Sequence, residues 1–328
     1  MKLVQTLVVR DEVDVVDDQI AYHLNAGVDF VIASDHQSTD GTTDILERYA
    51  REGHLRRIEV EGTMRDGPWR THMARLAAVE HGADWIVNTD ADEFWVPRRG
   101  TLKDIFASIP EQYGVVFALS RHFVPRPESP GRFWERMLVR ASPQAAIHDP
   151  TSPYRPHLKA AHRADPEISV SFGSHTVWTR SWRALHHWHP ADVLHFPFRS
   201  LSQWENKGVR RAQGDKPLGQ YVTALRAKEA GRSADRYGSL VVDDDRELEL
   251  GLTQGSLRSD TRLRDALAAI HDGRQAERDD SFDGAYDESY VADAVAVRDA
   301  DIVRLRRHLD RLEVRVAALD GLDQAHAR

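Results

Sequence analysis

The sequence predicts a doubly wound α/β fold, with helices on both faces of a mostly parallel sheet. Two observations lead to this fold class. Short apolar runs alternate with segments of helical periodicity through the first 120 residues, and polar side chains gather where the apolar runs end. With 328 residues, of which 41% are hydrophobic, the chain can bury the core that such a fold needs.

The first strand is expected at 3–9, where "LVQTLVV" is a continuous apolar run typical of a strand buried on both faces. A helix follows in 15–27 and stops at Gly27. The alternation continues with a strand at 28–34, a helix in "STDGTTDILERYAREG", a strand at 55–60, a helix near 69–82 and a strand at 83–88. In sheets of this kind, ligands bind beyond the carboxyl ends of the strands.

Composition argues against several classes of function. The net charge of −8 disfavours a general nucleic-acid binder, and the absence of cysteine excludes a disulfide framework or a thiolate metal site. The first residues meet charge too early for a signal peptide, and no stretch approaches the ~18 apolar residues of a membrane span. We therefore expect a cytoplasmic protein.

Three carboxylates crowd the end of the strand predicted at 83–88, in "NTDADEF". Asp90 and Asp92 can point to the same side of an extended segment, and such a pair can bind one hard cation, Mg²⁺ or Mn²⁺. A simpler interpretation is a solvated turn, with Glu93 starting a helix. Buried carboxylates need a compensating charge. The sequence therefore predicts that a metal diphosphate supplies it.

Two other strand ends carry polar residues, in "VVRDE" and "SDHQSTDGT". The second could bind an anion at a helix N-terminus or simply cap that helix. Together with "WIVNTDADEF", these segments resemble the nucleotide-binding half of family 2 type glycosyltransferases with the GT-A fold, over residues 3 to about 120. The resemblance implies a DxD motif that binds the divalent metal of a nucleotide-diphosphate sugar.

The resemblance also implies roles for single residues. Val9 and Glu12 would line the nucleoside pocket, and Asp35 would meet the base. Asp90 would meet the ribose or a metal-bound water, and Asp92 would bind the metal directly. The chain departs from the common family pattern after the second strand, where His and Gln stand at 36 and 37 in place of an acid and a glycine.

The second half of the chain is similar to downstream segments of a bacterial branch of these transferases, in "PHLKAAHR", "GSHTVW" and "DVLHFPFRSLSQWENKG". His195 is the favoured third metal ligand, with His175 as the alternative, because imidazole at a strand end can complete the site. Arg199 and Lys207 would neutralise the diphosphate. Either histidine could instead be a core residue that backbone groups satisfy.

The resemblance implies an inverting reaction, which needs a base that takes the proton of the acceptor hydroxyl. The candidates are Asp149, Asp192 and His175. The acceptor would be a saccharide or a lipid-linked glycan, and three tryptophans could stack on it or pack on the sheet: Trp178, Trp182 and Trp188.

The motif "LHHWHP" contains three histidines and could indicate a zinc site. Its histidines at 186, 187 and 189 are too close together in the chain to converge easily on one tetrahedral ion. An acceptor-site loop is the preferred interpretation.

We expect four regions: a nucleotide-sugar-binding half (1–120), an acceptor-binding and catalytic half of the same domain (121–240), a helix with a polar linker (241–285) and a C-terminal helix (286–328). In the last region, apolar residues repeat at spacings of three and four. This stripe predicts a homo-oligomer. The alternatives are docking on the chain's own core and, through its arginines, peripheral contact with anionic lipid.

Two other classes of function compete with a glycosyltransferase. A metal-dependent nucleotidyltransferase or phosphohydrolase would also use an acidic strand end. A non-catalytic nucleotide-binding protein would share the fold without the chemistry.

Overall fold

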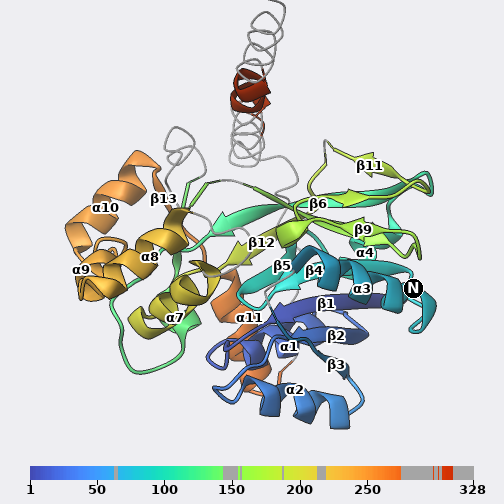
Figure 1. The fold of residues 1–328 in the computed structure, drawn as a ribbon, viewed down its shortest axis with the longest axis horizontal. Helices are drawn as coiled ribbons and strands as arrows, with labels where there is room; N and C mark the ends of the chain where they lie inside the picture. The colour runs from blue at the N-terminus through green and yellow to red at the C-terminus, as the bar shows by residue number, and fades with distance from the viewer. Residues whose placement is uncertain are drawn as a thin grey trace, which may run out of the picture.

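A computed structural model of the chain describes residues 1–62, 66–142, 154–155, 157–186, 188–212 and 219–274, together with 298, 302 and 305–312. A nine-stranded mixed sheet forms its centre (Figure 1). The strands of this sheet are β1 (Leu3–Val9), β2 (Phe30–Asp35), β3 (Leu55–Glu59), β4 (Trp85–Asp90), β5 (Glu93–Pro97), β6 (Tyr113–His122), β8 (Leu158–Arg163), β11 (Arg183–Leu185) and β12 (Ala191–His195).

The strand order is β3-β2-β1-β4-β8-β6-β12-β5, and β11 also pairs with β6. The first four strands of this order are parallel to one another, and β6 is parallel to β11 and β12. Only β8 and β5 pair antiparallel with their neighbours in this sheet as described. Because β8 runs in the opposite direction, its first residues lie beside the carboxyl end of β6.

Helices cover both faces of the parallel half of the sheet, as the sequence predicts. The helices concerned are α1 (Val16–Asn25), α2 (Thr42–Arg51) and α3 (Asp66–Val79). Side chains alternate between faces along a strand. Accordingly, Leu7 of β1 joins a core cluster with Ile20 of α1 and Leu46 of α2, whereas Val8 joins another with Met73 of α3. The prediction of a mixed α/β fold with a mostly parallel sheet is confirmed.

The segment after Asp92 is a strand. It does not start a helix, so the simpler interpretation of "DADEF" is wrong. Phe94 and Trp95 are fully buried in β5, opposite Leu194 and Val193 of β12. Burial of two large aromatic side chains in a sheet outweighs the weak helical signal of a single Glu.

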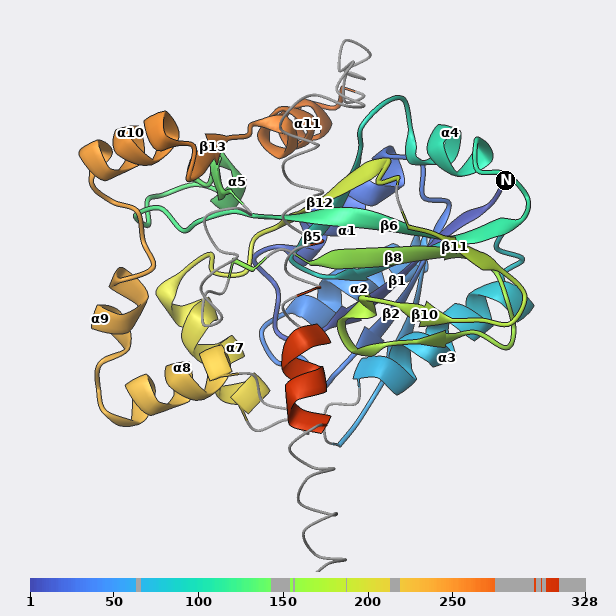
Figure 2. The same cartoon turned by 90° about the horizontal axis from the view of Figure 1, so that it is seen from above.

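The second half of the chain adds helices along one end of the sheet (Figure 2). Its further elements and those that connect the strands are α4 (Leu102–Ala107), α5 (Phe133–Arg136), β7 (Val139–Ala141), β9 (Ser169–Val170), the 3-10 helix η1 (Phe172–Ser174), β10 (Val177–Trp178), α7 (Leu201–Ala212), α8 (Gly219–Glu229), α9 (Ser233–Gly238), α10 (Asp245–Gln254), β13 (Leu257–Ser259) and α11 (Arg262–His271). The sequence does not predict that α11 returns to the body, where it packs against α1 and α5.

Most of the predicted C-terminal helix lies outside the described residues. Within it, 305–312 is helical, and Leu305, Leu309 and Leu312 are exposed. In the part of the chain that the structure describes, no helix has the length and apolar composition needed to cross a bilayer.

Candidate active site

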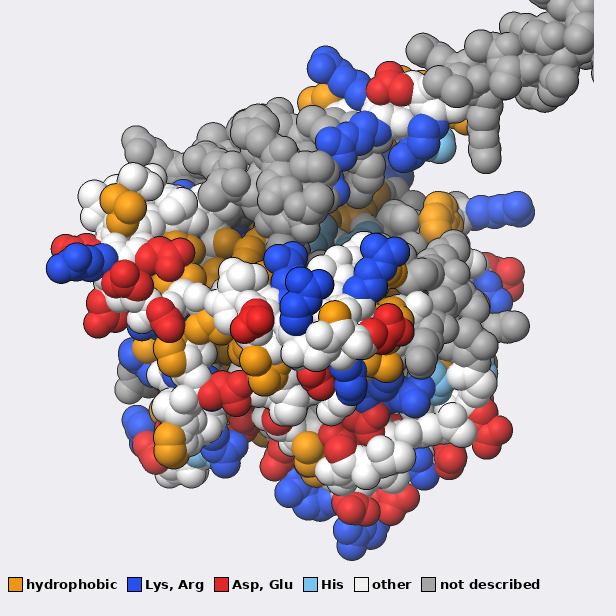
Figure 3. All heavy atoms as spheres, turned by 60° about the vertical axis from the view of Figure 1, so that its left-hand side comes forward, with side chains coloured by type: hydrophobic (Ala, Val, Ile, Leu, Met, Phe, Trp, Pro, Cys, Tyr) orange, Lys and Arg blue, Asp and Glu red, His pale blue; other side chains and the backbone are white. Residues whose placement is uncertain are grey.

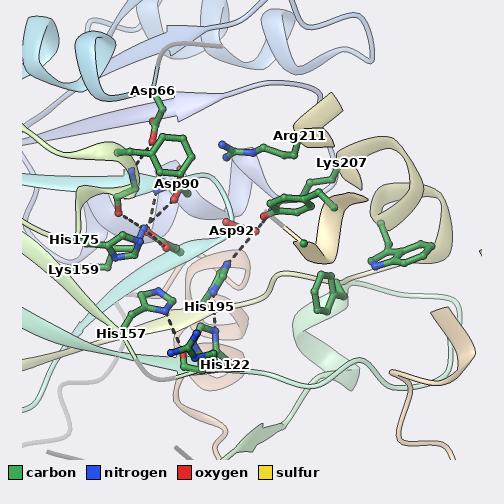
Figure 4. Close-up of a pocket in the computed structure, with 18 of the residues that line it drawn as sticks. Asp66, Asp90, Asp92, His122, His157, Lys159, His175, His195, Lys207 and Arg211 are labelled. Atoms are coloured by element: carbon green, nitrogen blue, oxygen red, sulfur yellow. Dashed lines mark hydrogen bonds and ion pairs between the residues drawn. The ribbon is translucent and has the colours of Figure 1, made fainter. Parts of the chain in front are cut away.

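The candidate site is a cavity of about 540 Å³ at the carboxyl ends of β4, β6 and β12 (Figure 4). On the face shown in Figure 3, acidic and basic side chains are interspersed over the surface. Inside the cavity they are concentrated, because four carboxylates line it together with lysines, arginines and histidines. The acidic strand end that the sequence singles out therefore opens into a charged cavity.

Asp90, the last residue of β4, is compensated by two cations of the protein. Its Oδ1 accepts a hydrogen bond from Arg70 of α3, and its Oδ2 lies 3.0 Å from Nζ of Lys159 on β8. Burial alone would raise the pKa of Asp90, but Arg70 and Lys159 lower it far below its ordinary value. Asp90 is therefore ionised at neutral pH.

Asp92 is buried and makes a similar set of contacts on the other side of the turn. Its Oδ2 contacts Nζ of Lys207 on α7, and Nε2 of His195 lies 3.4 Å away. Burial would raise the pKa of Asp92, but Lys207 and His195 hold it well below its usual range. In Figure 4, Asp92 lies between these two partners.

Glu93 shares the cation of Asp90. Lys159 Nζ lies 2.7 Å from Glu93 Oε1 and donates a hydrogen bond to the carbonyl oxygen of Gly173 at 2.8 Å. Burial raises the pKa of Glu93, although Lys159 opposes the shift. Buried lysine and arginine side chains of the protein therefore compensate the charges of these carboxylates.

The predicted metal ligands can be tested against this arrangement. Mn²⁺ or Mg²⁺ needs carboxylate oxygens with free lone pairs. Both oxygens of Asp90 already accept from cations, and Oδ2 of Asp92 is shared between Lys207 and His195. In this arrangement protein cations balance the charges of Asp90 and Asp92. A metal ion held by Asp90, Asp92 and His195 would compete with Arg70, Lys159 and Lys207 for these carboxylates, and this ligand set stays a prediction.

Among the described residues, the group whose ligand atoms converge is a different one. His122, His157 and His195 each offer one ring nitrogen, and these atoms all lie within 4.8 Å of one another. All three side chains line the cavity. The site therefore holds a candidate metal centre made of imidazole nitrogens.

Arg211, in the last turn of α7, lines the cavity without an ion-pair partner within the described residues. In Figure 4 its guanidinium points toward Asp66 and Asp90. Burial would lower the pKa of Arg211, but Tyr221 and Asp90 raise it, so it carries its charge. A partnerless arginine beside paired carboxylates leaves a positive position for an anionic ligand.

Comparison with protein families decides the class of enzyme. The model of glycosyltransferase family 92 matches residues 4–217, well over half of the chain. The chain belongs to glycosyltransferase family 92. The prediction of a glycosyltransferase is confirmed, although the resemblance had suggested family 2.

Among solved structures, the similarities to this glycosyltransferase are weaker. It is similar to TarS from S. aureus, with 15% identity, 71% of this chain and 43% of that chain covered, and a TM-score of 0.33. It is also similar to TarS 1–349 in complex with UDP, with 12% identity, 93% and 92% covered, and a TM-score of 0.35. The chain thus spans less than half of the first of these two. At these TM-scores the likenesses assign no role to any residue of this chain. A comparison with curated proteins gives no match.

The predicted nucleoside-pocket residues of the glycosyltransferase do not line the cavity. Val9 is buried at the end of β1, and Glu12 is bound by Arg199. Asp35 accepts hydrogen bonds from the hydroxyl of Thr43 at 2.7 Å and from Arg57 at 3.1 Å. These contacts give the polar strand ends structural partners.

Arg199 is buried and does not line the cavity. It binds Glu12 and donates from Nε to Asp14 Oδ2 at 2.7 Å, while its Nη1 lies 3.8 Å from Asp92 Oδ2. Lys207, by contrast, lines the cavity. Of the two cations predicted to meet the diphosphate, the structure therefore brings one to the site.

The three candidate bases are separated. Asp149 lies outside the described residues. Asp192 is buried on the face of β12 opposite to His195, where Arg98 donates to it at 2.7 Å and Arg121 at 3.0 Å. Burial would raise the pKa of Asp192, but its arginine partners keep it far below the ordinary value. His175 alone of the described candidates lines the cavity.

None of the three tryptophans predicted to contact an acceptor lines the cavity, and neither do His186 and His189. Trp178 is 59% exposed, whereas Trp182 covers Gly114 and Trp188 packs against the core. His189 hydrogen-bonds the carbonyl oxygen of Phe117 at 3.1 Å. His187 lies outside the described residues.

Several site residues have no signal of their own in the sequence. Asp66 and Arg70 belong to a helix that only the fold brings to Asp90, and they bind each other at 2.6 Å. His122 and His157 end up beside His195 because three strands align. Lys159 is the exception, since a charged residue inside the apolar run "LKAAH" indicates a buried partner.

Proposed function

We propose that the enzyme transfers a sugar from a nucleotide-diphosphate donor to a hydroxyl group of a saccharide or lipid-linked glycan. The observation that carries this proposal is the pair Lys207 and Arg211, one turn apart on α7 and both lining the cavity. The diphosphate leaving group gains negative charge as the glycosidic bond breaks. Fixed cations beside it therefore lower the barrier.

The two cations have different surroundings. Lys207 is held by Asp92 and lies 3.8 Å from Glu12 Oε1, so its position is set before a ligand arrives. Arg211 has no such partner among the described residues, and a guanidinium can bind two phosphate oxygens at once. In this proposal Asp92 positions Lys207, and Arg211 clamps the diphosphate.

Aromatic rings support a sugar or a nucleobase in the same cavity. The rings that line it are those of Phe172, Phe198, Trp204 and Tyr221. Their apolar faces suit the apolar face of a pyranose or the plane of a base. An anionic end with aromatic walls fits a nucleotide sugar better than a simple phosphate.

His175 is the described candidate nearest to the role of base. Its Nδ1 lies 2.9 Å from the carbonyl oxygen of Leu158, which can only accept, so Nδ1 carries the proton and Nε2 is left as an acceptor. Burial lowers the pKa of His175 to about 4. Such a weak base orients an acceptor hydroxyl better than it deprotonates one. The proposal assigns His175 this orienting role, with inversion at the anomeric carbon, which NMR of the product would check.

The test is direct binding of nucleoside diphosphates by calorimetry, combined with release of the diphosphate from a panel of nucleotide sugars. We expect Arg211→Gln to weaken binding at least tenfold, about 1.4 kcal/mol, because a charge-assisted hydrogen bond contributes about 1.5–3 kcal/mol. Arg226→Gln is the matched control. Arg226 is exposed on the neighbouring helix α8 and does not line the cavity. Equal affinity of the Arg211 variant and wild type would contradict the proposal.

A further inference from the structure

Three histidines lie at the same end of three adjacent strands. His122 ends β6 and His195 ends β12, and the two residues are directly paired in the parallel register. His157 precedes β8, and its carbonyl oxygen accepts a hydrogen bond from Ser120 of β6 at 3.0 Å. The sheet therefore fixes the backbone positions of all three rings, and Figure 4 shows the rings grouped on one side of the cavity.

Each ring has one nitrogen that faces an oxygen acceptor. Nε2 of His122 lies 3.0 Å from the carbonyl oxygen of Arg155, and Nδ1 of His157 lies 3.2 Å from the same oxygen. Nε2 of His195 lies 3.4 Å from Asp92 Oδ2. Metal-binding histidines typically donate their second N–H to a carbonyl or carboxylate in this way.

The other nitrogens remain for a ligand: Nδ1 of His122, Nδ1 of His195 and Nε2 of His157. The first two are 2.9 Å apart. Two nitrogens bound to one tetrahedral Zn²⁺ lie about 3.3 Å apart, given Zn–N distances of about 2.0 Å. The three ligand atoms lie within 4.8 Å of one another, so metal binding requires side-chain rotations that bring all three nitrogens to that spacing.

The protonation state of the imidazole rings also suits metal binding. Burial lowers the pKa of His122 and of His157 well below the usual range, so both are neutral at pH 7. Neutral imidazole is the form that binds metal ions. Three imidazoles select a borderline ion of the zinc type, whereas Mg²⁺ prefers oxygen ligands.

We propose that His122, His157 and His195 bind one divalent transition-metal ion of the zinc type. Because all three side chains line the cavity, a further coordination position is open to a water or to an oxygen of a ligand. Asp92 is then the carboxylate that orients His195. The proposal concerns metal binding by the chain itself and does not depend on the identity of the sugar donor.

The experiment uses the full chain, stripped of metal by dialysis against a chelator. Binding of Zn²⁺ is measured by calorimetry and by elemental analysis after gel filtration, and Co²⁺ is added as a spectroscopic probe whose visible absorption reports tetrahedral nitrogen ligands. We expect about one ion per chain in the wild type. His122→Ala and His157→Ala should each lose it. His122 is buried, so its variant could lose the ion through a folding defect. His157 is only half-buried, so loss of the ion in its variant reports on metal binding itself.

Further variants separate this site from one in the "LHHWHP" segment and from one between the aspartates. His186→Ala removes an exposed histidine of the "LHHWHP" segment and should keep the ion. Asp90→Asn should also keep it, whereas Asp92→Asn should weaken binding roughly tenfold through its effect on His195.

Loss of the ion in Asp90→Asn would overturn the proposal, and so would unchanged binding in His157→Ala. Absence of bound Zn²⁺ and Co²⁺ in the wild type would equally overturn it, because the rings would then be joined only by a proton between the two Nδ1 atoms. Nucleoside diphosphate binding to the metal-free protein is measured in parallel, so failure of the metal site is distinguishable from failure of the proposed function.

Discussion

Nζ of Lys159 lies 3.0 Å from Oδ2 of Asp90, which joins the antiparallel strand β8 to the carboxyl end of the parallel strand β4. The reversed direction of β8 makes this contact possible, because its first residues reach the end of the sheet where the acidic turn lies. A buried ammonium shared by two carboxylates fixes the turn before any ligand binds.

Removing this ammonium should destabilise the fold strongly. We expect Lys159→Met to lower the free energy of unfolding by about 3–5 kcal/mol, because Glu93 is left buried with its charge uncompensated. Urea denaturation would measure the change. The double variant Lys159→Met/Glu93→Gln should recover part of the loss, since it removes the stranded charge. A loss below ~1 kcal/mol in the single variant would show that the pair contributes little.

Asp92→Asn should abolish most turnover, because the carboxylate positions both Lys207 and His195. Asp92 is buried, so the variant should also lose stability; some of the Lys207 charge remains balanced by Glu12. Circular dichroism and a thermal melt would establish that the variant is folded at the assay temperature. Turnover equal to that of the wild type would show that Asp92 has no role in the reaction.

Much of the first half of the fold is predictable from the sequence, because β1, β2 and β4 are mostly apolar runs that end at polar turns, whereas β3 carries two arginines. The cations that compensate Asp90 and Asp92 are not predictable. Arg70, Lys159 and Lys207 come from three elements far apart in the chain, and only the strand order brings them together. The histidine cluster has the same origin, since the register of β6 and β12 aligns two residues 73 positions apart.

His23 should make the fold sensitive to acid. It is fully buried on α1, accepts from the backbone N–H of Trp95 at Nε2 and bonds the carbonyl oxygen of Gln19 at Nδ1. Burial lowers its pKa to about 4 in the folded state, against about 6.5 unfolded. The unfolded chain binds the proton first, so the stabilisation is present above about pH 6.5 and is lost as the pH falls toward 4.

The expected loss from His23 alone is about 3 kcal/mol over that interval. Urea denaturation of wild type and His23→Gln from about pH 7 to about pH 4 would measure it, and His54→Gln is an exposed control. The difference between wild type and the His23 variant should shrink as the pH falls. A difference independent of pH would contradict the assignment.

Close packing of α7 on α8 should control the cavity. A Cβ added at Gly208 would lie 2.4 Å from Cβ of Ala224, so Gly208→Ala must push the helices apart. We expect a stability loss of about 1–3 kcal/mol and weaker diphosphate binding, because Lys207 and Tyr221 line the cavity from these helices. Gly238→Ala, where nothing lies within 4 Å, is the control. Equal diphosphate affinity in the two variants would show that the packing of α7 on α8 does not affect diphosphate binding.

The C-terminal helix should mediate self-association. Ile302, Leu305, Leu309 and Leu312 are 47%, 60%, 56% and 41% exposed and recur at spacings of three and four residues. Such a narrow apolar stripe suits a second helix better than the broad face of a sheet, and a second copy of this chain offers an identical stripe. We therefore expect truncation after residue 285 to lower the mass seen by light scattering to that of a monomer. Donor hydrolysis should persist, because 285 lies beyond the last helix of the body, α11. A full-length chain that is already monomeric would refute self-association, and a truncated chain that no longer folds would indicate instead that this helix docks on its own body.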